Sequence, residues 1–231
     1  MMTLMQAEFA KIKRKGFLIL SFLGGFGVVA LQMVNYGVRK EWLMEQNQDH
    51  WGYYLMNVQG FIPLAIVLGS VILAVQIAGV EEETNAWKQQ LALPLSKKKL
   101  YAAKFFVVLS YLILASVLLM IFTLIYGMVL NFDQAIPYEA IARQSILPVL
   151  AVLPIVAVQL WISVVSKSQS VAITTGIVQF LLTYSAFSLP DWMPWKWINL
   201  LNPTWNVGLG ISVGVVVFLM GMYDFYRKDA K

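Results

Sequence analysis

Cysteine is absent from the 231 residues, and histidine occurs once, as His50. The absence of thiols excludes disulfides, thiolate metal sites and cysteine nucleophiles. A single histidine also gives little support for a histidine-based metal site or a catalytic triad. Charged side chains are scarce at 13% of residues, whereas soluble domains carry about 25%.

Apolar residues make up 59% of the chain, and its mean hydropathy is +0.70. This composition indicates an all-α membrane protein that crosses the bilayer several times. The net charge is +5, but the basic residues lie beside apolar runs. We therefore interpret them as topology signals and expect no nucleic-acid partner.

Six apolar stretches are near or above the roughly 20 residues that cross about 30 Å of hydrocarbon. They are residues 17–33, 55–80, 104–130, 145–166, 169–189 and 205–223. A short polar break at Lys167 separates the fourth stretch from the fifth and predicts a tight turn on the cytoplasmic side. The sequence therefore predicts six transmembrane helices.

The residues before the first span carry a helical pattern. Met2, Met5, Phe9 and Ile12 recur at spacings of three and four, with Glu8 and several basic residues on the remaining faces. This pattern predicts an amphipathic helix that lies on the membrane surface. A removable signal peptide is the alternative, but the later spans favour a retained anchor.

Basic residues are unevenly divided between the two sides of this topology. If the N-terminus is inside, four of the 17 Lys and Arg lie outside, whereas the acidic residues divide evenly. The four are Arg39, Lys40, Arg143 and Lys196. Because Lys and Arg orient membrane proteins, both termini and the loop after the second span are expected in the cytoplasm.

Ionisable residues are missing from the six predicted spans, apart from Lys104 at the margin of the third. Pumps and ion-coupled transporters usually carry such groups, so a transporter of this kind would take its energy from a partner. The chain has no GxxxxGK[ST] loop, which assigns nucleotide hydrolysis to a separate polypeptide. Polar residues inside the spans, such as Gln159, Gln179 and Thr183, could line a path, but we favour hydrogen bonds between helices.

Tryptophan gathers in the expected outer loops. Six of the eight lie in or beside these loops, namely Trp42, Trp51, Trp192, Trp195, Trp197 and Trp205. An aromatic belt at the lipid headgroups is the simpler interpretation. The alternative is an outward-facing surface for an amphipathic substrate, formed by Trp192, Trp195, Trp197 and Trp205. The proline-rich stretch 188–205 predicts irregular or re-entrant structure.

The most informative polar segment runs from Glu81 to Lys104. An acidic triplet opens it, an amphipathic run follows to Leu93, and Pro94 ends that run because proline disfavours helix at the preceding residue. Ser96 is the expected N-cap of the next helix, which places Lys97 to Lys99 in its first turn. Cations are disfavoured at that end of the helix dipole, so these lysines are explained first as anchors on the cytoplasmic side.

With this topology in place, the run TNAWKQQLALPLSKKKLYAAK, together with an N-terminal helix ending in KIKRK, resembles the membrane subunits of ABC-2-type transporters. The matching positions are Glu82 or Glu83, Asn85, Ala86, Trp87, Leu91, Pro94, Ser96, Lys97 to Lys99 and Lys104. The chain lacks the glycine that commonly precedes the Trp region, and it has lysine where arginine often follows the serine. The register of the helix in this segment therefore stays open.

The resemblance implies one ABC-2-type transmembrane domain over residues 1–231, in a bacterial cell membrane, with a cytoplasmic ATPase and a second membrane subunit as partners. ATP and Mg²⁺ would bind to the ATPase, and no cofactor to this chain. A cytoplasmic coupling helix would dock on the ATPase through Glu81, Glu82, Glu83, Asn85, Trp87, Leu91 and Pro94. In that site, Trp87 and Leu91 share one helical face as the buried anchor, and the glutamates supply charges at its rim.

In its small size, six predicted spans and Trp-rich outer loops, the chain is most similar to the permeases that protect bacteria against lantibiotics or bacitracin-like peptides. Related permeases move ions, lipids or polysaccharides, so those substrates remain alternatives. The coupling segment could instead be a helix that lies on the inner leaflet.

Two other classes of protein are weighed against transport. Tandem glutamates occur in intramembrane proteases of the EExxxR type, but the arginine position is occupied here by Ala86 or Trp87. His50 is also expected on the opposite side of the membrane from these glutamates. The second class is a non-transporting sensor or immunity protein, which would bind a peptide through the outer aromatic residues.

Overall fold

The computed structural model describes residues 2–13, 15–83, 96–166 and 168–227, without the side chains of residues 2, 3 and 81–83. Every regular element within these ranges is helical, which confirms the all-α prediction. The elements are α1 Met2–Ile12, α2 Phe17–Glu45, α3 His50–Gln59, α4 Ile62–Glu83, α6 Lys97–Leu130, α7 Tyr138–Ala151, α8 Leu153–Val165, α9 Gln169–Tyr184, the 3₁₀ turn η1 Ala186–Ser188, α10 Pro194–Trp197 and α11 Pro203–Arg227.

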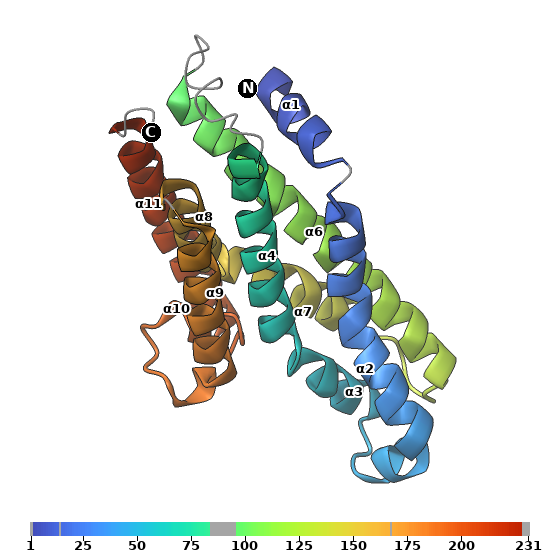
Figure 1. Ribbon diagram of the computed structural model, residues 1–231. Helices are drawn as coiled ribbons and strands as arrows, with labels where there is room; N and C mark the ends of the chain where they lie inside the picture. Colours follow the sequence, from blue (N-terminus) through green and yellow to red (C-terminus); the bar gives the residue numbers. More distant parts are fainter. Residues whose placement is uncertain (1, 14, 84–95, 167, 228–231) are drawn as a thin grey trace.

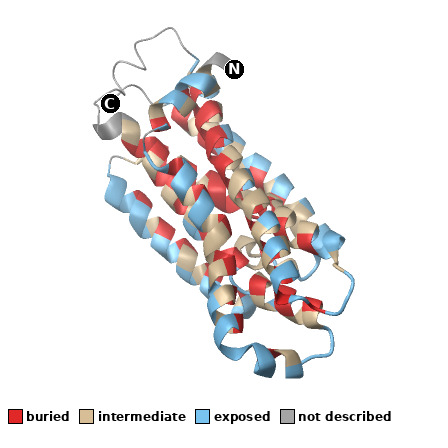
Figure 2. Cartoon of the chain, turned by 90° about the vertical axis from the view of Figure 1, so that its right-hand side faces the viewer, coloured by how far each residue is buried: buried red, intermediate tan, exposed pale blue. Residues whose placement is uncertain are grey.

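The helices form an elongated bundle with two distinct ends (Figure 1). One end, called the α1 end here, holds α1, the last turns of α4 and α11, and the first turns of α6. The other end, the α10 end, holds α3, α10 and the last turns of α2 and α6. Buried residues line the interior of the bundle, while its outer faces carry many exposed apolar side chains (Figure 2).

Among the described residues, four helical runs are long and apolar enough to cross a membrane: α2, α3 with α4 as His50–Val80, α6, and α11. The pair α7 and α8 adds a fifth if it counts as one span. Helix α9 has 16 residues, which is about 24 Å at 1.5 Å per residue and shorter than the hydrocarbon thickness. A sixth span at residues 169–189 therefore stays a prediction.

The span predicted at residues 145–166 is not one straight helix in the structure. The helix begins earlier, at Tyr138, and breaks at Val152 into α7 and α8, which are bent by 41°. Pro154 explains the break, because its ring nitrogen has no hydrogen to donate to the carbonyl of Leu150 and the ring crowds that carbonyl. The break lies against α11, where a Cβ on Gly210 would come within 2.6 Å of the Leu150 carbonyl oxygen.

Helices α2 and α6 define the longest part of the bundle. Helix α2 continues to Glu45, well past the predicted end at Met33, with non-helical angles at Arg39 (φ −131°, ψ 28°). Helix α6 begins at Lys97 after Ser96, as predicted, although the Ser96 side chain makes no capping hydrogen bond. Gly16, with φ of +79°, makes the turn between α1 and α2, a conformation that glycine adopts without strain.

Candidate functional site

The predicted coupling segment is only partly within the structure. Glu81 to Glu83 form the last residues of α4. Asn85, Trp87, Leu91 and Pro94 lie outside the described residues, as does the predicted helix that contains them. Its two flanks are described: α4 ends at Glu83 and α6 begins at Lys97, both at the α1 end of the bundle.

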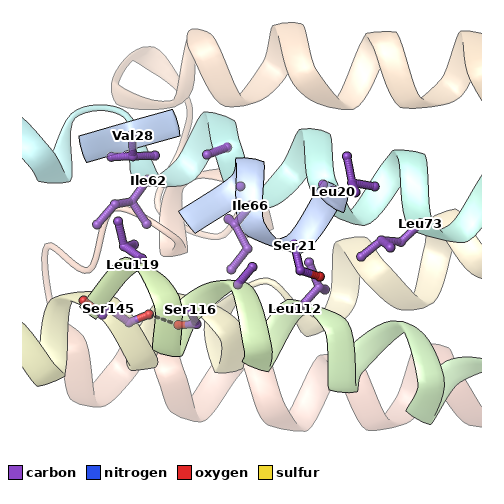
Figure 3. Close-up of a pocket in the computed structure, with 14 residues that line it drawn as sticks. Leu20, Ser21, Val28, Ile62, Ile66, Leu73, Leu112, Ser116, Leu119 and Ser145 are labelled. Carbon is purple, nitrogen blue, oxygen red and sulfur yellow. Dashed lines mark hydrogen bonds between the residues drawn. The ribbon is translucent and has the colours of Figure 1, made fainter. Parts of the chain in front are cut away.

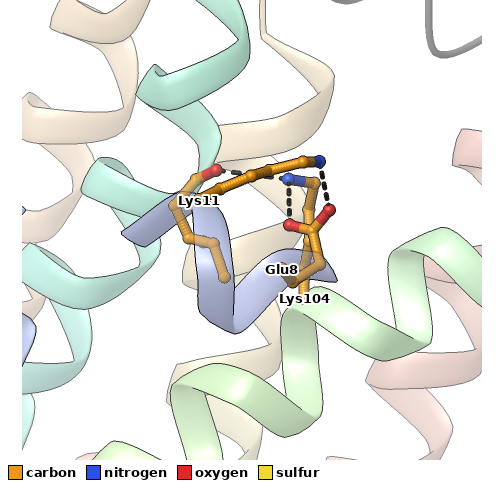
Figure 4. Close-up of polar contacts among 4 residues, drawn as sticks. Glu8, Lys11 and Lys104 are labelled. Carbon is orange, nitrogen blue, oxygen red and sulfur yellow. Dashed lines mark hydrogen bonds and ion pairs between the residues drawn. The ribbon is translucent and has the colours of Figure 1, made fainter. Parts of the chain in front are cut away.

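Close to these flanks, a buried ion pair joins α1 to α6 (Figure 4). The Lys104 Nζ atom lies 2.9 Å from Glu8 Oε2, with 0% and 2% of the two side chains exposed. The same ammonium donates to the carbonyl oxygen of Ile77 in α4, at 3.3 Å. Lys11, which is 29% exposed, pairs with the other carboxylate oxygen of Glu8.

The sequence pattern misplaced Glu8. It put this residue on a polar face of an amphipathic helix, whereas the structure buries it against Lys104. The apolar side of α1 packs as expected, because Ile12 is 1% exposed and the Phe9 ring lies 5.8 Å from the ring of Tyr111 in α6. Helix α1 therefore docks on the bundle through both apolar and ionic contacts, and its place on a membrane surface stays a prediction.

The charges of this cluster compensate one another. Burial alone would raise the pKa of the Glu8 carboxyl, but the ammonium groups of Lys104 and Lys11 hold that pKa below its usual value. Glu8 is therefore ionised at neutral pH. Removing Glu8 would leave the buried Lys104 ammonium without this carboxylate, and loss of one partner costs about 3–5 kcal/mol in comparable buried pairs.

A second polar contact at the α1 end joins α8 to α11. The indole nitrogen of Trp161 donates to Asp224 Oδ2 at 2.9 Å. Nearby in α11, the ring of Tyr226 lies 4.8 Å from the Lys98 ammonium at the start of α6. The α1 end therefore concentrates charged groups from α1, α6 and α11 around the two helix ends that flank segment 84–95.

The four tryptophans predicted to form one outer aromatic surface are divided by the structure. Trp192 and Trp205 are 70% and 66% exposed, but Trp197 is 4% exposed and donates through its indole nitrogen to the Asp191 carbonyl at 2.7 Å. Trp195 is half-buried and packs against the core. Trp197 therefore cannot contribute to a surface, and the exposed candidates are Trp192 and Trp205.

The tryptophan beside His50 is also structural. Trp51 is 3% exposed and packs on Tyr54 and Phe132, with ring centroids 6.0 and 5.3 Å away. The aromatic residues at the α10 end thus include part of the core as well as exposed rings.

A cavity of about 40 Å³ lies between α2, α4, α6 and α7 (Figure 3). Apolar side chains line most of it, and two of its three serine hydroxyls donate to backbone carbonyls: Ser21 to Tyr111 and Ser116 to Ser145. This space is large enough to hold a water molecule. A wider apolar groove of about 400 Å³ lies between α4 and α9 and includes Gln76. No ionisable side chain lines either space.

Polar residues inside the helices join neighbouring segments. Gln179 of α9 donates to Gln159 Oε1 of α8 at 2.7 Å, and Gln159 donates to the Ala172 carbonyl of α9 at 2.8 Å. These contacts confirm the prediction of hydrogen bonds between helices for these two glutamines.

The single histidine and the acidic triplet lie on one helical run. No group of three or more His, Asp or Glu side chains there could hold a metal ion. The His50 Nε2 atom contacts the Met44 carbonyl at 3.2 Å near the α10 end. His50 begins the helical run that continues through α4 to the α1 end of the bundle, where Glu81 lies. The separation of His50 from the glutamates, expected from the topology, is therefore seen along this run.

Comparison with known proteins gives one family match. A family model described as "ABC-2 family transporter protein" matches residues 4–185, from α1 to the end of α9. No curated protein matches the chain, and neither does any solved structure.

Proposed function

The chain belongs to the ABC-2 family of transporter proteins, and from this premise we propose that it is the membrane permease subunit of an ATP-driven transporter. In this proposal, ATP and Mg²⁺ bind to a separate cytoplasmic ATPase. The permease changes conformation when that ATPase closes and opens. This assignment agrees with the missing nucleotide-binding loop and with the apolar interior of the described helices.

The coupling site of the proposal is the segment from Glu81 to Pro94, with Trp87 and Leu91 as its apolar anchor. The observation that carries it is the placement of its flanks. Helices α4 and α6 lead into and out of the segment at the same end of the bundle as α1. A partner that pushes on the segment would act on two long helices at once.

We place the α1 end in the cytoplasm of a bacterial cell and the α10 end outside. Support comes from the bias of Lys and Arg, because Lys97 to Lys99 begin α6 at the α1 end and such residues favour the cytoplasmic side. A second membrane subunit, identical or related, would complete the transporter.

The proposed substrate is an amphipathic antimicrobial peptide that is expelled from the membrane. Exposed Trp192 and Trp205 support this choice, since they offer aromatic faces and indole N–H groups outside the core. Permeation of ions, lipids or polysaccharides is the competing outcome of the same experiment, which is run with each class of substrate.

Co-purification with the ATPase tests the coupling site. Wild-type permease is expected to bind the ATPase and stimulate ATP hydrolysis, while Trp87→Ala and Glu83→Ala weaken both. For Trp87→Ala the loss is expected to be about tenfold or more, as for anchors at interface centres. Undiminished association and stimulation in both variants would rule out docking through this segment.

A further inference from the structure

The Lys104 ammonium contacts three helices at one point. It lies on α6, pairs with Glu8 of α1 at 2.9 Å, and donates to the Ile77 carbonyl of α4 at 3.3 Å (Figure 4). Glu8 and Lys104 are 96 residues apart in the chain. This contact therefore fixes the N-terminal helix to two helices that come much later.

Both later contacts lie close to segment 84–95. Ile77 is within two turns of the end of α4 at Glu83, and Lys104 is within two turns of the start of α6 at Lys97. The ion pair thus sits where the helices that flank the segment meet α1. A displacement of the segment reaches this pair before it reaches most of the bundle.

The surroundings make the pair resistant to separation. Glu8 and Lys104 are 2% and 0% exposed, and Leu100 and Val107, one turn on either side of Lys104, are buried as well. Charges without water attract each other strongly, and each is costly to leave alone. Helix α1 can therefore move away from α4 and α6 only by breaking a contact that the apolar surroundings strengthen.

We propose that the Glu8–Lys104 pair makes α1 part of the coupling machinery, so that α1, α4 and α6 move together when the ATPase acts on segment 84–95. Glu8 and Lys104 are positioning residues in this scheme, and they contact neither substrate nor ATP. The inference rests on the proposed function, because it needs an ATPase that drives this permease.

The test measures substrate molecules moved per ATP hydrolysed in vesicles that contain the full-length permease and its ATPase. Glu8→Gln and Lys104→Met each remove one charge at nearly constant side-chain size. The double variant Glu8→Gln/Lys104→Met removes both charges of the pair. Arg143→Met is the control, because the Arg143–Glu139 pair is 69% and 76% exposed and lies on α7, which is not one of the two helices that flank segment 84–95.

We expect each single variant and the neutral double variant to bind the ATPase normally and to move roughly tenfold less substrate per ATP, within the usual range of coupling between sites. Arg143→Met is expected to keep the wild-type ratio of substrate moved per ATP. If the pair only held the fold together, its substitution would change the amount of inserted protein. The number of substrate molecules moved per ATP would then stay at the wild-type value.

A wild-type ratio of substrate moved per ATP in the neutral double variant would overturn the inference, even if the single variants fail to fold, because that variant removes both charges of the Glu8–Lys104 pair. A different result bears on the proposed function alone: if the wild-type protein shows no ATP-dependent transport of any substrate class, the permease assignment itself fails.

Discussion

Buried polar side chains in this bundle are stabilised in two ways. Lys104 pairs with Glu8 and donates to a backbone carbonyl. Gln159 and Gln179 are neutral and bond to each other across α8 and α9. Hydrogen bonds between membrane helices contribute about 0.6 kcal/mol on average and up to about 2 kcal/mol. Single substitutions at these residues should therefore have measurable effects on stability.

Gln179→Leu is expected to lower the stability of the purified protein by about 1 kcal/mol, because Gln159 Oε1 loses its donor from α9. Thermal unfolding in detergent would measure this. Thr175→Val is the matched control on the same helix, since Thr175 bonds only to carbonyls of its own helix at Val171 and Ala172. Equal effects from the two substitutions would contradict the interhelical role of Gln179.

Sequence reasoning succeeded with residues whose surroundings are set by their own segment. The glutamines lie within apolar runs, so their need for partners on other helices could be foreseen. Glu8 and Trp197 could not be placed, because their partners depend on how distant segments pack. The position of Lys104 at the margin of a predicted span was the available signal that a buried acid should be sought.

Among the described glycines, Gly210 of α11 makes the closest approach to backbone atoms of another helix, at the break between α7 and α8. A Cβ at Gly210 would lie 2.6 Å from both the Ala151 Cα atom and the Leu150 carbonyl oxygen. Small residues let membrane helices pack this closely. Gly210 therefore lets α11 fit the bend that Pro154 introduces.

Gly210→Ala is expected to destabilise the bundle by about 1–3 kcal/mol, because the new methyl group meets backbone atoms that must shift. Gly208→Ala is a control from the same helix, where a Cβ meets nothing within 4 Å. In a helix that control should be neutral or stabilising by up to about 1 kcal/mol. Thermal unfolding of both variants checks the contrast, and a neutral Gly210→Ala would contradict the close packing.

The helices were predicted best where a long apolar run coincides with one straight helix. The start of α6 after Ser96 and the long runs of α2, α4, α6 and α11 follow from hydropathy and capping residues. The bend at Val152 was missed because apolar content continues through it, although Pro154 was a visible signal. The extension of α2 to Glu45 was missed because polar residues can continue a helix beyond the hydrocarbon layer.

At the scale of the whole molecule, the two ends have different compositions. The α1 end carries the buried ion pair, the first lysines of α6 and both flanks of segment 84–95. The α10 end carries the exposed rings of Trp192 and Trp205. This polarity is the basis for assigning ATPase coupling to one end and substrate contact to the other.

Labelling of single cysteines would test the orientation, and the absence of native cysteine makes it unambiguous. Lys99→Cys and Asp133→Cys lie in exposed positions near the start and just after the end of α6. We expect an impermeant maleimide to label Asp133→Cys on intact cells and Lys99→Cys only after permeabilisation. The reverse labelling pattern would show that the orientation is opposite to the proposed one. Equal labelling of both cysteines on intact cells would exclude the placement of the two ends of α6 on opposite sides of the membrane.

ATP-dependent movement of a labelled antimicrobial peptide, in vesicles that contain the permease and its ATPase, tests the central claim most directly. The account predicts that the wild-type protein expels the peptide only with hydrolysable ATP, and that Trp87→Ala lowers this expulsion about tenfold while inserting normally. Peptide binding that is the same with and without ATP, in wild-type and Trp87→Ala vesicles alike, would contradict it and identify the chain as a membrane protein that sequesters its ligand.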